Sequence, residues 1–169
     1  LFQLERTNTK GPDPVDPSLT ALVGESRTRG VELNLVGEIM PGWQANLGYT
    51  YLDGEITSTS VDGPAGRRLQ QLPEHQISAW TRYDFSEMFG LGLGVIYQDE
   101  QFASFTNAVT LPDYVRVDAA AYYTVNDRLA LQLNVENLFD ASYFPAAHGD
   151  NNIQPGRPLS ARLGVRVKL

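Results

Sequence analysis

The stretch Trp43-Gln44-Ala45-Asn46-Leu47-Gly48-Tyr49-Thr50-Tyr51 decides the fold of this protein. Its odd positions are apolar or aromatic and its even positions are polar or small, which is the period of two that a β-strand gives its two faces. No segment of the chain shows a sustained helical period. The sequence therefore predicts an all-β protein of about eight strands, the others being residues 1–6, 31–39, 77–85, 91–97, 115–125, 129–135 and 161–169.

The connections between these strands fall into two classes. Short ones are expected at 40–42, 86–90 and 125–128, where Pro-Gly and Asn-Asp are turn signals. Long polar ones are expected at 8–23, 58–73, 104–112 and 141–156. Because long and short connections alternate strictly, the pattern indicates an up-and-down antiparallel barrel with one smooth rim and one elaborated rim.

The two faces of the predicted strands favour a membrane barrel. One face is apolar and aromatic, and the other carries charges of both signs, which suits lipid outside and a polar lumen inside. A strand of about 13 residues rises ~43 Å, and a tilt of ~45° reduces its height to ~30 Å, near the thickness of the hydrocarbon core. Trp43, Phe85 and Tyr123 lie near the short turns, where we expect an aromatic girdle.

Two other β architectures are alternatives. A soluble sandwich or lipocalin-like barrel would use the apolar face as its core. A small standalone eight-stranded outer-membrane barrel, structural or adhesive, would suit the strand number. Against the small barrel, Gly92, Gly94 and Ala120 leave inner positions small, charges would crowd a narrow lumen, and residues 1–6 are short for closing onto the last strand.

Composition excludes several classes of function. The 169 residues carry a net charge of −7, which argues against nucleic-acid binding. There is no cysteine, and the two histidines, His75 and His148, stand far apart in sequence without a catalytic motif beside them. Gly24-Glu25-Ser26-Arg27-Thr28 is not a G-x-S-x-G element. We therefore expect no enzyme, no metal ligands and no cofactor.

Several motifs resemble the C-terminal part of TonB-dependent outer-membrane receptors of the ferric-siderophore type. The strongest is Asn134-Val135-Glu136-Asn137-Leu138-Phe139-Asp140-Ala141-Ser142-Tyr143, which is similar to the family's N-x-x-N-L-F-D-x-x-Y element. Glu25–Leu33 and Leu111–Asp118 resemble two strand openings, and Leu72–Gln76 resembles a third with one proline fewer. The final strand resembles the outer-membrane assembly signal, with Leu169 in place of the usual aromatic residue.

The resemblance implies a longer protein than this chain. Residues 1–169 would be the last eight strands of a 22-stranded barrel in the outer membrane of a Gram-negative bacterium. The plug domain, the earlier strands and the N-terminal part that meets the TonB energy-coupling complex would be absent, and the start at Leu1 without Met agrees with a fragment. The implied function is uptake of ferric siderophores, in which the chelator alone ligates the iron.

The resemblance also implies two groups of site residues. Ligand-binding candidates in the loops and upper lumen are Arg67, Arg68, Phe102, Phe105, Tyr114, Tyr143, Phe144 and His148. Candidates that face the plug are Arg82, Asp84, Arg116, Asp118, Glu136 and Arg162.

Each group has a structural alternative. Tyr143 and Phe144 would pack under a loop, His148 would be solvated, and the two arginines would offset acids such as Asp62. The lumen charges would instead pair with each other across strands. The Asn134–Asp140 element is interpreted as structural, with side chains that satisfy backbone groups.

Overall fold

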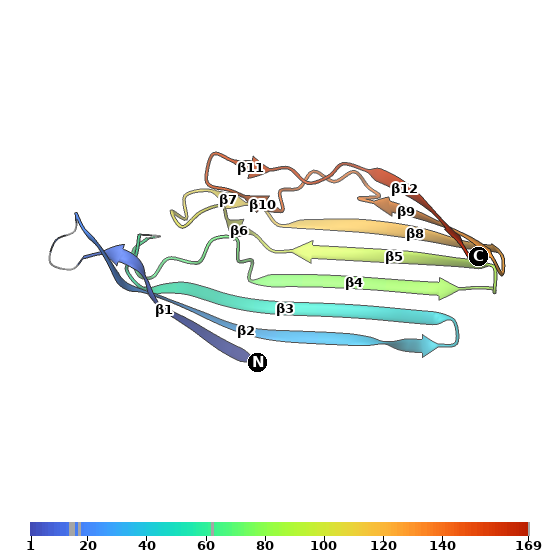
Figure 1. Cartoon of the computed structure of the whole chain (residues 1–169), viewed down its shortest axis with the longest axis horizontal. Helices are drawn as coiled ribbons and strands as arrows, with labels where there is room; N and C mark the ends of the chain where they lie inside the picture. Colours follow the sequence, from blue (N-terminus) through green and yellow to red (C-terminus); the bar gives the residue numbers. More distant parts are fainter. Residues whose placement is uncertain (14–15, 17, 62, 169) are drawn as a thin grey trace.

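A computed structural model of the chain describes residues 1–13, 16, 18–61 and 63–168, so Asp62 and Leu169 lie outside the described residues. One antiparallel sheet of eight strands dominates it (Figure 1). No helix long and apolar enough to cross a bilayer occurs in the part of the chain that the structure describes. The sheet consists of β1 (Phe2–Pro12), β2 (Thr20–Met40), β3 (Trp43–Ser58), β4 (His75–Asp84), β5 (Phe89–Gln98), β8 (Tyr114–Asn126), β9 (Leu129–Glu136) and β12 (Ser160–Val167).

The order of the strands in the sheet is their order in the chain. β1, β2, β3, β4, β5, β8, β9 and β12 each pair with the next, always antiparallel, so the predicted up-and-down topology is confirmed. Short turns join strands at one end of the sheet and long connections at the other (Figure 1). Two small ribbons lie within the long connections, β6 (Gln101–Phe102) with β7 (Thr110–Leu111) and β10 (Ala146–Ala147) with β11 (Ile153–Gln154).

The prediction of a long loop over residues 8–23 is wrong. β1 continues to Pro12 and β2 begins at Thr20, and the two strands stay paired up to that last position. β3 likewise extends to Ser58, beyond the predicted residue 51. In these extensions charged residues such as Arg27, Asp53 and Glu55 occupy the face that is apolar in the rest of β2 and β3, whereas Leu52 and Ile56 of β3 lie on the opposite face. Backbone pairing therefore continues where the outer face is no longer apolar.

The sheet is open and lacks a second layer. β1 and β12 form opposite edges, and these two strands do not pair with each other. The apolar face is exposed, with Leu35 67% and Leu163 66% accessible. A soluble sandwich would cover this face, but the described residues offer no element that does so. The cluster of buried apolar residues consists of Ala103, Leu111 and Ala147, and it lies among the loops.

Aromatic rings gather on the apolar face near the short turns. Trp43 meets Tyr83 edge to face at 6.5 Å, and Tyr83 meets Phe85 at 5.6 Å. Phe89 and Tyr123 stack at 4.6 Å on the neighbouring strands. The rings of Trp43, Tyr83 and Tyr123 suit the boundary between lipid and water, because in each an apolar body adjoins a polar group. The predicted girdle is therefore present, and it includes Tyr83 and Phe89 in addition to the expected residues.

Candidate functional site

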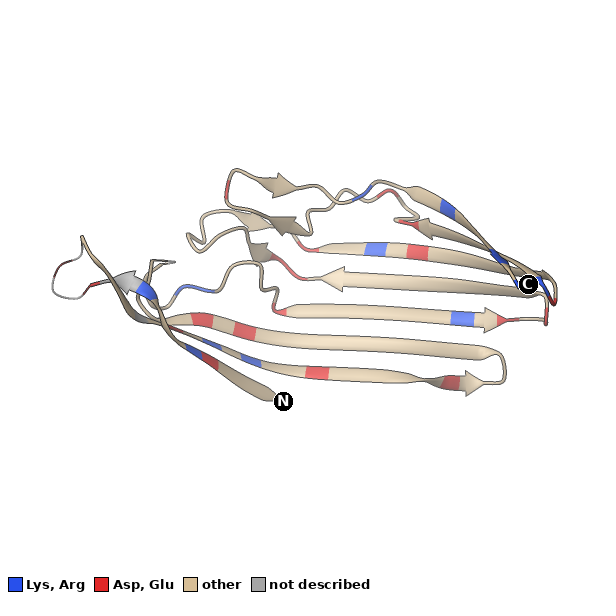
Figure 2. Cartoon of the chain, in the orientation of Figure 1, with Lys and Arg blue, Asp and Glu red and all other residues tan. Residues whose placement is uncertain are grey.

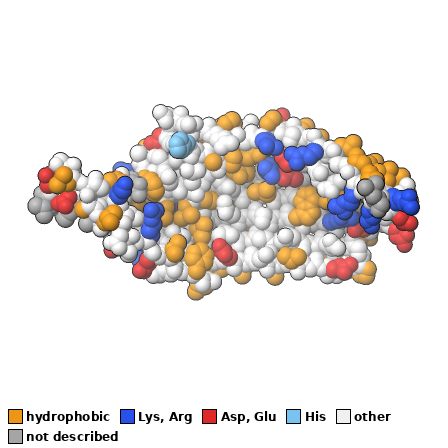
Figure 3. Space-filling view, viewed as in Figure 1, with side chains coloured by type: hydrophobic (Ala, Val, Ile, Leu, Met, Phe, Trp, Pro, Cys, Tyr) orange, Lys and Arg blue, Asp and Glu red, His pale blue; other side chains and the backbone are white. Residues whose placement is uncertain are grey.

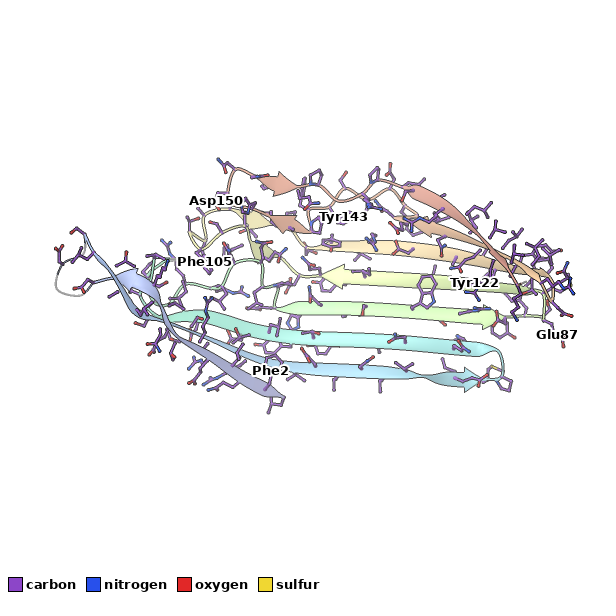
Figure 4. All side chains as sticks on the ribbon, in the orientation of Figure 1. Phe2, Glu87, Phe105, Tyr122, Tyr143 and Asp150 are labelled. Carbon is purple, nitrogen blue, oxygen red and sulfur yellow. The ribbon has the colours of Figure 1, made fainter. Side chains whose placement is uncertain are left out.

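The candidate site is the end of the sheet at which the long connections meet. The connection 99–113 contains β6 and β7, and the connection 137–159 contains β10 and β11. Leu111 of the first and Ala147 of the second share a small core with Ala103 and Val109. Figure 4 shows Phe105, Tyr143 and Asp150 together at this end, while Tyr122 and Glu87 lie toward the opposite one. We call these two connections, together with the described part of residues 59–74, the loop rim.

Hydrogen bonds join the three segments of the loop rim to each other. The Asn107 side chain accepts from the Arg68 backbone N–H at 3.0 Å and donates to the Arg68 carbonyl at 3.1 Å. The Ser104 and Thr106 hydroxyls donate to the two carboxylate oxygens of Asp150 at 2.7 and 2.6 Å. Gln101 donates to the Pro145 carbonyl at 3.0 Å. The rim is therefore one pre-organised, hydrogen-bonded assembly of three segments.

The hydroxyl pair also changes the acidity of Asp150. Hydrogen bonds from Thr106 and Ser104 favour the carboxylate, so the pKa of Asp150 lies below its ordinary value. The carboxylate is therefore charged at neutral pH. It holds the tips of two connections together through charge-assisted hydrogen bonds, which are stronger than neutral ones.

A polar cluster lies beneath the loop rim, on the polar face of β8. Arg116 donates to Asp118 at 2.8 Å and to the Tyr143 hydroxyl at 3.2 Å. The Tyr143 ring lies 4.7 Å from that of Tyr114 and packs directly over Gly156, where a Cβ would collide with it. Tyr143 is only 6% exposed. Its ring is therefore enclosed by the wall and the last connection rather than presented to the lumen.

Asn137 confirms the structural interpretation of the Asn134–Asp140 element. Its side chain is 1% exposed and donates to the carbonyls of Ala141 and Arg157, both at 2.9 Å. The same side chain accepts from the Ala141 N–H at 2.9 Å. Asp140 in turn accepts from the Leu159 N–H at 2.8 Å. These side chains replace strand partners that the backbone loses where β9 ends.

Five predicted ligand residues lie on or directly beneath the loop rim. Arg67 donates to the Phe105 carbonyl at 3.1 Å, and Arg68 pairs with Glu74 at 2.7 Å. The Arg68 guanidinium also stands 5.9 Å from the centre of the Phe102 ring. Their side chains, like that of Tyr114, are partly exposed.

The other predicted ligand residues are divided between surface and interior. Phe144 is 37% exposed, and His148 is exposed on the connection between β10 and β11, where its N–H donates to the Asn152 carbonyl at 2.8 Å. Tyr143 occupies the enclosed position described above. The structure therefore brings the arginines and Phe102 together with Phe105 and leaves His148 apart from that group.

The predicted plug-facing charges lie along the polar face of the sheet. Arg82 pairs with Asp84 at 2.9 Å and Arg116 with Asp118 at 2.8 Å, each two residues along one strand (Figure 2). These pairs run along strands, whereas the alternative of a self-satisfied wall required pairing across strands. Glu136 lies 3.9 Å from Arg157, and Arg162 is exposed on β12. Lys and Arg side chains gather near the short-turn end in Figure 3.

Sequence reasoning missed two aromatic residues of this polar face. Trp80 lies flat against β5, where a Cβ at Gly92 or at Gly94 would come within 2.6 Å of its ring. Tyr122 lies 4.0 Å from the Arg82 guanidinium, in cation–π geometry. The available signal in the sequence was Gly92 and Gly94, two residues apart on one strand. In the β4–β5 register Gly94 lies opposite Trp80, and a glycine there leaves room for the ring.

The comparisons with known proteins agree with this geometry. Residues 1–138 match the family described as TonB dependent receptor-like, beta-barrel. The chain is 35% identical to the probable TonB-dependent siderophore receptor PiuA of Acinetobacter baumannii, over 99% of this chain and 24% of that protein. It is 32% identical to the catecholate siderophore receptor Fiu of Escherichia coli, over 85% of this chain and 20% of that protein.

Solved structures show the same relationship. The crystal structure of PiuA superposes with a TM-score of 0.84 at 35% identity, over 98% of this chain and 25% of that one. The closed form of the ferric-catecholate import receptor Fiu superposes with a TM-score of 0.82 at 27% identity, over 96% of this chain and 23% of that one. The chain spans about a quarter of the length of the curated relatives it matches.

An antiparallel wall with an apolar face, an aromatic girdle and one elaborated rim defines an outer-membrane β-barrel segment. The chain belongs to the TonB-dependent receptor β-barrel family. Its place is therefore the outer membrane of a Gram-negative bacterium, where the aromatic and apolar face meets lipid and the polar face meets the lumen.

Proposed function

We propose that this chain is the C-terminal wall of a receptor that takes up ferric siderophores by TonB-coupled active transport. The observation that carries the proposal is the pre-organised loop rim, which presents two arginines and two aromatic rings in an assembly fixed by hydrogen bonds. The names of PiuA and Fiu support the class of cargo. The relatives are receptors, and we propose accordingly that this protein has no enzymatic activity.

The chemistry of the rim suits an anionic, partly aromatic chelate. Arg67 and Arg68 offer cationic donors, and Phe102 and Phe105 offer ring faces for stacking. Only Glu74 forms an ion pair with this group in the described residues, so the two arginines leave an excess of positive charge. The rim need not ligate iron, because the chelator fills the coordination sphere of the metal. We therefore propose that the ferric siderophore is cargo and that the protein holds no cofactor for it.

Growth on single iron sources tests the proposed function. Deletion of the gene that encodes this chain should abolish growth on at least one ferric chelate from a panel of catecholate, hydroxamate and mixed siderophores, and plasmid expression should restore it. Arg67→Ala with Arg68→Ala should weaken binding of that chelate roughly 10- to 100-fold, the range for lost hydrogen bonds to charged groups. Arg128→Ala, at the short-turn end, is the matched control. Growth of the deletion strain on every chelate would overturn the proposal.

We further propose that the polar face of the sheet contacts a plug domain supplied by the rest of the receptor. Arg162 and Arg166 are exposed on β12 and form no ion pair among the described residues. Glu136 and the Arg82–Asp84 pair extend this surface. Arg116 and Asp118 form its inner support, since Asp118 also accepts from the Asn137 N–H at 2.8 Å. An exposed charged wall of this kind suits a polar partner of opposite charge.

Crosslinking tests the plug contact. A photoreactive residue at position 162 should crosslink within the full receptor to a segment that precedes this chain, and the yield should change when cargo and the energy-coupling complex are both present. The same probe at Leu163, on the lipid face, is the control and should give no crosslink within the protein. Equal crosslinking from both positions would contradict a lumen partner at Arg162.

A further inference from the structure

We propose that Glu74, His75 and Asp99 form a binding site for a divalent transition-metal ion, at the loop end of β4 and β5. One nitrogen of His75 and one carboxylate oxygen of each acid lie within 4.8 Å of one another. An imidazole with two carboxylates is a donor set that suits Zn²⁺ and related first-row ions. The site is distinct from the cargo, whose iron is ligated by its chelator.

The backbone of the sheet fixes where these residues stand. His75 is the first residue of β4, and Asp99 directly follows the last residue of β5. The Asp99 N–H donates to the His75 carbonyl at 2.9 Å, which extends the β4–β5 ladder by one more bond. The Leu52 N–H donates to the Glu74 carbonyl, also at 2.9 Å. All the ligand residues are thus held by the rigid end of the sheet rather than by a loop tip.

A second layer of contacts orients each ligand through one of its two polar atoms. His75 Nδ1 bonds the Tyr49 hydroxyl at 3.0 Å, and Glu74 Oε1 accepts from Arg68 at 2.7 Å. Asp99 Oδ1 accepts from the neighbouring backbone N–H at 3.0 Å and from the hydroxyl of Tyr97 at 3.4 Å. Such outer contacts are characteristic of metal ligands, because they fix the tautomer of a histidine and the orientation of a carboxylate.

The other polar atom of each ligand remains available. Among the described residues, no hydrogen bond involves Nε2 of His75, Oε2 of Glu74 or Oδ2 of Asp99. Bonds of about 2.1 Å place the ligands of a tetrahedral ion about 3.4 Å apart. Because the ligand atoms lie within 4.8 Å of one another, closure requires each pair to approach by about 1.4 Å at most. The rings of Tyr49 and Tyr51, centred 6.1 and 5.1 Å from that of His75, pack against the imidazole.

The local charge also favours a cation. Arg68 contributes one positive charge, but Glu74 and Asp99 contribute two negative ones, and Glu100 directly follows Asp99 in the chain. A divalent ion therefore enters a region of net negative charge. Its binding would connect β4 to β5 directly below the part of the loop rim that carries Arg68.

Metal titration of the purified full receptor tests the site. After removal of bound metal, calorimetric titration should show that the unaltered receptor binds one Zn²⁺ ion at this site. Each of the variants Glu74→Gln, His75→Gln and Asp99→Asn should abolish that binding. Co²⁺ should give the visible absorption of a four-coordinate site in the unaltered protein alone. Tyr49→Phe, which removes an outer contact, should weaken Zn²⁺ binding about 10- to 100-fold. His148→Gln is the matched control, because it removes the other histidine of the chain and should leave binding unchanged.

Folding is checked separately, by migration with and without heating and by thermal unfolding. Zn²⁺ should raise the unfolding temperature of the unaltered receptor and leave that of a folded His75→Gln variant unchanged. Unchanged Zn²⁺ binding in His75→Gln and Asp99→Asn, or its loss in His148→Gln, would overturn the proposal. These readouts do not involve ferric-chelate uptake, so the site and the proposed function succeed or fail independently.

Discussion

The side chain of Asn137 supports two segments of one connection at once. Asn137→Ala would leave the buried carbonyls of Ala141 and Arg157 unpaired and would place alanine at a φ of +53°. Each buried group left unpaired costs about 1–3 kcal/mol, so we expect a clear fall in the thermal unfolding temperature of the receptor. Asn151→Ala, in an exposed position, is the control and should change the stability by less than about 0.5 kcal/mol. Equal effects of the two substitutions would contradict the role of Asn137.

The Trp80 ring packs against two glycines of β5, Gly92 and Gly94. Gly92→Ala and Gly94→Ala should each displace the indole and destabilise the wall by about 1–3 kcal/mol, the usual cost of overpacking. In a Trp80→Ala background the same changes should cost little, because the obstructing ring has gone, so the effects should not add. Gly37→Ala, with nothing within 4 Å of the added methyl, is the control. Thermal unfolding of the single and double variants measures the coupling.

At the scale of elements, alternation predicts strands only where the two faces meet different media. Residues 43–51 have lipid on one side and a polar lumen on the other, so their sequence shows the period of two. Above the membrane, charged pairs such as Arg27 with Glu55 replace the apolar positions on the outer face of β2 and β3, while Ile56 on the opposite face of β3 is buried. Sequence reasoning therefore found every long strand but made β1, β2 and β3 too short at their loop ends. Sequence reasoning also included Tyr143 among the ligand-binding candidates. The residue that makes room for the Tyr143 ring, Gly156, comes later in the same connection and carries no motif that links it to Tyr143.

The Asp150 bridge between two connections should respond to pH in a defined direction. Because the folded pKa of Asp150 is lowered, the bridge is present above the ordinary aspartate pKa of about 3.9 and is lost as pH falls through the depressed value. Spin labels at Ala108→Cys and Asn151→Cys should report a constant separation from pH 7 to about 5 and a broader one in strong acid. In Asp150→Asn this pH response should disappear. A change of separation between pH 7 and 5 would contradict the assignment.

At the scale of the whole molecule, the open sheet determines what these residues do in isolation. β1 and β12 each present an unpaired backbone edge, and such edges associate with other chains. Residues 1–169 expressed alone should therefore aggregate in detergent and give no heat-modifiable monomer on gel electrophoresis. The small-barrel alternative requires a stable monomer instead. Size-exclusion chromatography in detergent separates the two outcomes, with the full receptor as the folded control.

The links within the loop rim also limit how cargo preference can be exchanged between receptors. Asn107 holds the backbone of Arg68, and Asp150 holds the tip that carries Ser104 and Thr106, so each connection forms part of the support for its neighbour. A single connection transplanted from a relative would arrive without its supports. Transfer of a new chelate preference should therefore require all three connections together. The sequences of the three connections should also vary together across the family.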